Sequence, residues 1–157
     1  MGKPKKTGLE IMKTKRVVID ASGLILGRLA SHVAKKILAG GEVMIVNAEK
    51  AKIVGSKRYI VEEFKKHLTT RTLGSQKKAP KHPRKPDTYV RRVVRGMIPW
   101  KRKTKGKIAY GRLKVYIGYP ATLGEESAQT ILDAKSNIQP SMTVGELMEI
   151  FGWKYPL

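Results

Sequence analysis

Cysteine is absent from this 157-residue chain, and acidic residues are scarce. Without a thiol, the chain has no disulfide scaffold, zinc ribbon, iron–sulfur centre or cysteine nucleophile. It also lacks any apolar run near the ~18 residues of a membrane span, and its first six residues contain no signal-peptide core. We therefore expect a soluble, intracellular protein that has no membrane partner.

Positive charge dominates what is present. The chain has 33 Lys and Arg against 12 Asp and Glu, which gives a formal net charge of +21. A charge of this size repels itself and favours a polyanionic partner, and nucleic acid is the leading candidate. Residues 65–107 hold 16 of the basic residues and a single acid, Asp87. Residues 120–157 are net acidic, so we expect them to lie away from the polyanion.

Apolar periodicity indicates an α/β fold. Residues 17–19 and 43–46 are continuous apolar runs typical of buried parallel strands. Between them, apolar residues recur every three or four positions from Leu26 to Ile37, as in an amphipathic helix that Gly40-Gly41 ends. Strand, helix and strand in this order form a right-handed βαβ unit with parallel strands. We expect a three-layer domain over residues 17–157, with a basic arm at 1–16.

The remaining elements complete this prediction. Helices are predicted at 57–68, with Glu62 and Lys66 as an ion pair, and at 143–151, opened by a Thr143 to Glu146 capping box. A strand is predicted at 113–117, and residues 52–54 are either an extension or an edge strand. The expected central sheet is mostly parallel, has about four strands and is flanked by helices.

The first strand-to-helix turn, Gly23-Leu-Ile-Leu-Gly27-Arg28, resembles a nucleotide-binding turn in position only. Its spacing fits neither the dinucleotide fingerprint nor the phosphate loop, so no cofactor is expected. We expect Gly23 to permit a tight turn and Gly27 a close contact between helix and sheet. Asp20 or Ser22 is the candidate N-cap, and the helix N-terminus with Arg28 could hold an RNA phosphate.

No constellation for catalysis or metal binding is evident. His32, His67 and His82 are far apart in the sequence and surrounded by cations, which would repel a divalent metal. An acid/base pair of Asp20 with Glu49 or Glu62 is conceivable, but nothing in their sequence spacing places these carboxylates together. Trp100 is either a hydrophobic plug at a helix end or a stacking surface for an unpaired base.

The basic central segment contains the candidate binding surface. A helix from about Asp87, ended by Pro99, should turn Val90, Val93, Val94 and Met97 to the core and its three arginines away from it. Long basic loops are predicted at 69–87 and 101–111, and residues 69–86 and 101–107 within them should order on RNA binding. The predicted RNA-binding residues are Arg28, Lys65, Lys66, Arg71, Lys77, Lys78, Lys81, Arg84, Lys85, Arg91, Arg92, Arg95, Lys101, Arg102, Lys103, Lys105 and Lys107.

Four sequence blocks in order carry a family resemblance, at residues 17–31, 46–50, 95–99 and 113–118. Together they resemble the universal large-subunit ribosomal protein family thirteen (uL13), in its archaeal or eukaryotic form. The resemblance implies a structural, non-enzymatic protein that binds large-subunit ribosomal RNA during assembly and meets neighbouring ribosomal proteins. It implies no small-molecule substrate.

Two other classes of protein fit parts of the same pattern. A nucleotide-binding α/β enzyme would bind its ligand at the carboxyl edge of the sheet. A basic nucleic-acid-compacting protein would bind duplex DNA as well as folded RNA.

Overall fold

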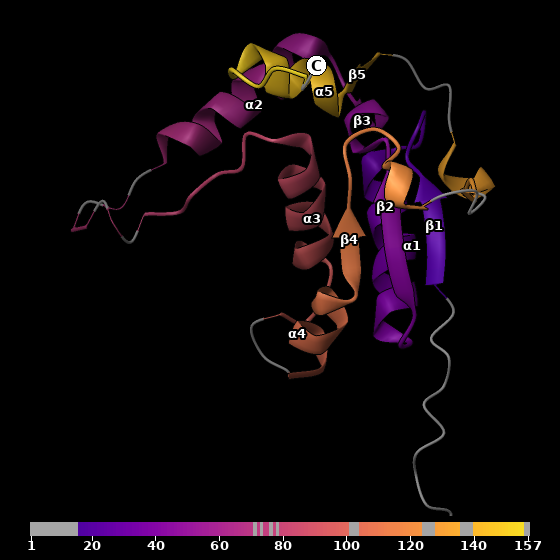
Figure 1. The fold of residues 1–157 in the computed structure, drawn as a ribbon. Helices are drawn as coiled ribbons and strands as arrows, with labels where there is room; N and C mark the ends of the chain where they lie inside the picture. The colour runs from indigo at the N-terminus through magenta and orange to yellow at the C-terminus, as the bar shows by residue number, and fades with distance from the viewer. Residues whose placement is uncertain are drawn as a thin grey trace, which may run out of the picture.

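Three parallel strands, β1 (Arg16–Asp20), β2 (Glu42–Val46) and β4 (Leu113–Val115), form the central sheet (Figure 1). The structure is a computed structural model that describes residues 16–70, 72, 74–75, 77, 79–100, 104–123, 128–135 and 140–155. The strand order is β1-β2-β4. Central β2 is buried from Val43 to Val46, as a continuous apolar run predicts. The predicted α/β class is confirmed, with three strands in the described sheet where about four were expected.

A second, smaller sheet stands apart from the first. Strand β3 (Lys52–Val54) pairs antiparallel with β5 (Ser141–Thr143), and Ile53 lies opposite Met142. The segment at 52–54 is therefore a strand, but it joins the chain's C-terminal part and not the central sheet.

Helix α1 (Leu26–Leu38) connects β1 to β2 and confirms the predicted βαβ unit. Its apolar stripe is buried throughout. Gly23 has a φ of +72° in the turn before it, and Gly40 has a φ of +106° just after its end, both in the region that glycine adopts readily. Gly27 is exposed, and a Cβ there would meet nothing within 4 Å. The predicted close contact at Gly27 is therefore wrong.

Asp20 and Ser22 do not cap α1, contrary to the prediction, because the N-cap residue is Ile25 and no side chain bonds there. The Asp20 carboxylate instead accepts hydrogen bonds from the Ser22 N–H at 2.9 Å, the Ser22 hydroxyl at 2.8 Å and the Asn47 amide at 2.9 Å. Burial acts to raise the pKa of Asp20, but these donors and the charge of Lys50 outweigh it and lower the pKa overall. The carboxylate thus ties the end of β1 to the end of β2.

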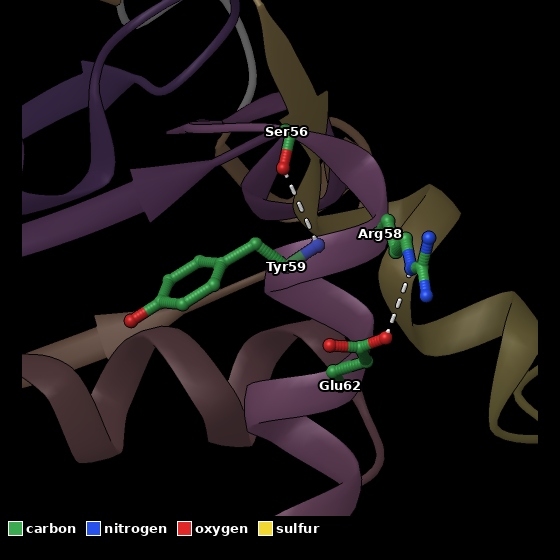
Figure 2. A network of polar contacts seen from close by, with 4 residues as sticks. All are labelled: Ser56, Arg58, Tyr59 and Glu62. Carbon is green, nitrogen blue, oxygen red and sulfur yellow. Dashed lines mark hydrogen bonds and ion pairs between the residues drawn. The ribbon is translucent and has the colours of Figure 1, made fainter.

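Helix α2 (Lys57–Thr69) begins where the Ser56 hydroxyl accepts a hydrogen bond from the Tyr59 N–H at 3.4 Å (Figure 2). The Glu62 carboxylate bonds to Arg58 at 3.1 Å (Figure 2) and not to Lys66, whose ammonium lies 3.9 Å from Glu63. The predicted Glu62–Lys66 pair is therefore wrong: Glu62 pairs with Arg58, four residues before it, and Lys66 pairs with Glu63, three residues before it.

Helix α5 (Val144–Ile150) packs against α2 and α3. Thr143 caps it by accepting a hydrogen bond from the Glu146 N–H at 3.1 Å, as predicted. The Phe64 ring of α2 lies 4.8 Å from Phe151 and 5.8 Å from Tyr89, measured between ring centroids. This aromatic cluster joins three helices.

Helices α3 (Pro86–Gly96) and α4 (Thr104–Gly111) occupy the basic segment. Figure 1 shows α2 and α5 near one end of α3 and α4 near the other. Helix α3 ends at Gly96, three residues before Pro99, so Met97 lies beyond the helical periodicity and is 43% exposed. Its predicted place in the core is wrong.

The basic loop predicted at 101–111 is also wrong over the part that the structure describes. Residues 104–111 form α4, while Lys101–Lys103 lie outside the described residues. A Cβ at Gly106 would lie 2.5 Å from the Pro99 carbonyl oxygen, so only glycine fits this contact. The sequence of α4 has little amphipathic pattern, so the contact between Gly106 and Pro99 is what positions this helix.

The two faces of the sheet pack against different layers. Ile19, Val43 and Ile45 belong to the main core with the helices. Val18, Met44 and Val46 pack on the other face with Leu123 of the 3-10 helix η3 (Ala121–Leu123). Two further 3-10 helices are η1 (Ala48–Lys50) and η4 (Leu132–Ala134). Within the described residues, no helix has the length and apolar character needed to cross a membrane.

Substitutions on α3 should separate core from surface. Val94 is fully buried, so Val94→Ala should lower the free energy of unfolding by about 1–3 kcal/mol because it leaves a cavity. Met97→Ala removes more atoms but should change it by less than about 0.5 kcal/mol. Urea denaturation measures both values, and equal losses would contradict the burial of Val94 and the exposure of Met97, just after the end of α3.

Candidate nucleic-acid interface

A cleft of about 300 Å³ lies beside α3 and is rich in cationic side chains. We call it the arginine cleft. Its lining residues are Lys81, His82, Pro83, Thr88, Arg91, Arg92, Arg95 and Tyr110.

Helical spacing places the arginines in the cleft. Val90 and Val94 are one turn apart and fully buried, which fixes the side of α3 that faces the core. Arg91 and Arg95 are likewise one turn apart and follow the two valines directly, so both lie beside the buried stripe and not opposite it. The valines and the arginines therefore lie on different sides of α3, as predicted, but Arg91 and Arg95 are not on the side opposite the buried valines.

Aromatic rings hold two of these guanidinium groups. The Arg91 guanidinium lies 5.1 Å from the centre of the Tyr110 ring, and that of Arg95 lies 5.8 Å from the Trp100 ring. The two rings contact each other edge to face at 4.9 Å. Each cation–π contact is worth ~0.5–1 kcal/mol at an exposed site and orients a planar fork of donors.

Trp100 itself is half-buried and packs against the main core. This arrangement favours the hydrophobic plug over the base-stacking surface, the two roles that the sequence left open. Its ring contacts the Arg95 guanidinium and the Tyr110 ring, two groups that line the cleft.

The segment that includes His82 forms the opposite wall. The Arg92 guanidinium donates a hydrogen bond to the Lys81 carbonyl oxygen, which ties this segment to α3. The His82 ring lies 6.0 Å from the His67 ring of α2, and the two planes are 29° apart. Partial burial, then the charges of Arg92 and His67, lower the pKa of His82.

Two buried nitrogen atoms of the cleft lack a hydrogen-bond partner, and none of its lining residues in the described part of the chain is acidic. Arg91 Nε and His82 Nε2 are buried and have no hydrogen-bond partner in the described part of the chain. Among the described residues, no carboxylate forms an ion pair with Arg91, Arg92 or Arg95. An anion would satisfy both the charge and the donors.

A second hollow of about 220 Å³ adjoins the arginine cleft. We call it the aromatic hollow. It shares His82, Pro83 and Arg92 with the cleft and adds Phe64, His67, Tyr89 and Val93.

The structure brings together only some of the predicted site residues. Lys81, Arg91, Arg92 and Arg95 line the arginine cleft. Lys65 and Lys66 line a separate hollow on α2. The other described members are exposed and lie outside these cavities, namely Arg28, Lys77, Arg84, Lys85, Lys105 and Lys107. The rest lie outside the described residues, namely Arg71, Lys78, Lys101, Arg102 and Lys103.

The Arg28 guanidinium donates a hydrogen bond to the Asp133 carbonyl oxygen at 3.3 Å. That bond connects the start of α1 to the C-terminal part of the chain. The predicted phosphate contact at this position stays a prediction.

Sequence reasoning missed the uncharged and aromatic side of the cleft. His82 was considered only as a metal ligand, and Tyr110 was placed in a loop. Within the described residues, no group of three potential metal ligands occurs. His67 and His82 are far apart in the sequence but adjacent in the fold. Two histidines and several aromatic residues on either side of an arginine-rich helix were the available signal.

Together, the fold and the arginine cleft are typical of the small basic proteins of ribonucleoprotein particles. A compact core supports a cationic surface whose α3 arginines form no ion pair with any carboxylate that the structure describes.

Comparison with known proteins identifies the family. The family described as ribosomal protein L13 matches residues 14–122. The chain is 45% identical over 141 residues to the large ribosomal subunit protein uL13 of Methanococcoides burtonii, across 88% of this chain and 99% of that protein. It is 43% identical over 144 residues to the protein of the same name from Methanopyrus kandleri, across 88% of each chain. The chain therefore belongs to the ribosomal protein L13 family.

Membership in this family confirms two expectations. The family consists of structural ribosomal proteins and not of enzymes, so the nucleotide-binding enzyme is excluded. The archaeal relatives agree with the predicted form of the family. A match over 88% of the chain also extends beyond the 17–118 blocks that carried the resemblance.

Titration of His82 should report the electrostatics of the arginine cleft. In the free protein, the His82 imidazole should titrate below the usual histidine pKa, because burial, Arg92 and His67 all disfavour its protonated form. Arg92→Ala should raise this pKa, since it removes a neighbouring positive charge. Two-dimensional NMR of the imidazole resonances, assigned with His82→Gln, measures both values. A midpoint at or above the usual value would contradict the described surroundings.

Proposed function

We propose that this protein binds and compacts large-subunit ribosomal RNA through the arginine cleft, and that it does so while the subunit assembles. The proposal is supported above all by three α3 arginines that share one cleft with Lys81 and lack ion-pair partners among the described residues. Neighbouring ribosomal proteins are the further partners that a subunit component requires.

The mechanism is charge neutralisation. Arginine and lysine side chains at the cleft displace counterions from phosphates, which gains translational entropy for the released ions. RNA helices that repel one another can then be held close together. The donors of Arg91, oriented over Tyr110, suit two oxygens of one phosphate.

Recognition through shape and backbone fits this surface better than reading of paired bases. An A-form RNA helix hides its base edges in a deep, narrow major groove. Side chains of α3 reach phosphates without entering that groove. Duplex DNA serves as the comparison ligand, because a general nucleic-acid-compacting protein would bind it equally well.

Salt dependence tests the mechanism. If six to ten phosphates are contacted, affinity for a large-subunit ribosomal RNA transcript should fall by about 10³–10⁵ between roughly 50 and 200 mM salt. The slope should be about −0.9 per phosphate for duplex contacts and about −0.7 for single strands. Filter binding measures it, and a nearly flat dependence would exclude charge neutralisation.

Single arginine substitutions locate the surface. Arg95→Ala should weaken RNA binding and reduce the magnitude of the salt slope by about one unit if Arg95 contacts one phosphate. The matched control is Arg58→Ala, which also removes one charge but from a side chain already paired with Glu62 (Figure 2). Both variants should keep the wild-type melting temperature to within a few degrees.

Two outcomes would move the proposed surface elsewhere. One is an equal loss of affinity in Arg58→Ala and Arg95→Ala. The other is equal affinity of the native protein for ribosomal RNA and duplex DNA, which would favour a general compacting protein.

A further inference from the structure

The arginine cleft and the aromatic hollow are adjacent and chemically different. Arg92, His82 and Pro83 line both, so the two spaces meet at these residues. One side offers guanidinium groups, while the other offers the rings of Phe64, His67 and Tyr89. A ligand that filled both would carry an anionic group at one end and a flat aromatic group at the other.

The rings around the aromatic hollow differ in their availability. Phe64 is buried and Tyr89 is half-buried in the cluster that joins the helices. His67 is exposed on α2 and faces His82, so it can contact a ligand without disturbing the core. Flat aromatic rings stack on any nucleobase, because every base has a π-face.

We propose that the arginine cleft and the aromatic hollow together bind one unpaired nucleotide of an RNA strand. Its phosphate lies in the arginine cleft, and its base stacks in the aromatic hollow beside His67 and His82. The inference rests on the proposed function and makes it more specific.

Two observations favour a nucleotide over a phosphate alone. The cleft has a volume of about 300 Å³, within the range of sites for small organic ligands, and the hollow adds about 220 Å³. In addition, the buried His82 Nε2 lacks a partner in the described part of the chain and lies where the two spaces meet. A base or a ribose could supply that partner.

An unpaired nucleotide fits better than a base pair. A base within a duplex is covered by its stacked neighbours, so its flat face cannot reach the rings of the hollow. A bulged or loop nucleotide presents that face freely. The site would therefore place this protein at a junction or loop of its RNA, next to helices whose phosphates the surrounding cations contact.

The test compares two RNAs of equal length and charge. One is a continuous duplex, and the other contains a single bulged 2-aminopurine riboside, whose fluorescence falls on stacking. At one fixed salt concentration, the native protein should bind the bulged RNA at least about fivefold more tightly, since stacking of one base supplies this much. Binding should also quench the fluorescence.

Variants assign the effect to the hollow. His67→Ala should abolish most of the preference for the bulged RNA and most of the quenching, while duplex affinity stays unchanged. The matched control is Tyr59→Ala, which removes a 61% exposed ring from the same helix (Figure 2) and should leave the preference intact. Arg95→Ala should weaken binding of both RNAs by similar factors.

The outcomes separate this inference from the proposed function. Equal affinity for both RNAs, or an unaltered preference in His67→Ala, would overturn the nucleotide site and leave RNA binding intact. Failure to bind either RNA would overturn the proposed function itself. Adenosine monophosphate that bound as tightly as the bulged RNA would overturn the assignment to an RNA strand.

Discussion

Burial of Val90 and Val94 is the constraint on which the surface chemistry depends. These valines must leave water, and this requirement sets the rotation of α3 about its own axis. Once the rotation is fixed, Arg91 and Arg95 can only lie along the border of the core, where Tyr110 and Trp100 meet them. Hydrophobic burial of the valines, and not attraction between charges, therefore determines on which side of α3 Arg91 and Arg95 lie.

The fold was largely predictable because its central signals are local. Continuous apolar runs gave β1 and β2, and a three-and-four repeat gave α1. The predictions were wrong where contacts between residues outside one local element determine the structure. Gly106 fits against Pro99 and allows α4 to form in a stretch that reads as a basic loop, while Asp20 bonds to Asn47 and not to the helix that follows it.

The candidate site was predictable in its charge but not in its shape. A count of basic residues pointed to residues 65–107, and helical spacing selected the arginines of α3. Neither observation predicts that the rings of His67 and His82, fifteen positions apart in the sequence, lie 6.0 Å from each other, because His67 is on α2 and His82 is in the segment before α3. Aromatic partners such as Tyr110 were missed for the same reason, because long-range packing brings them to the cations.

The contact between Gly106 and Pro99 has a consequence for how this surface is built. Because no side chain separates them, α4 packs closely against the segment that follows α3, and the Tyr110 ring of α4 lies 5.1 Å from the Arg91 guanidinium. The orientation of the Arg91 guanidinium, which contacts Tyr110, therefore depends on the missing side chain at Gly106, where even a methyl group would clash with Pro99. Steric fit below the cleft thus acts together with its polar contacts, such as the hydrogen bond from Arg92 to the Lys81 carbonyl oxygen, to position the cationic groups.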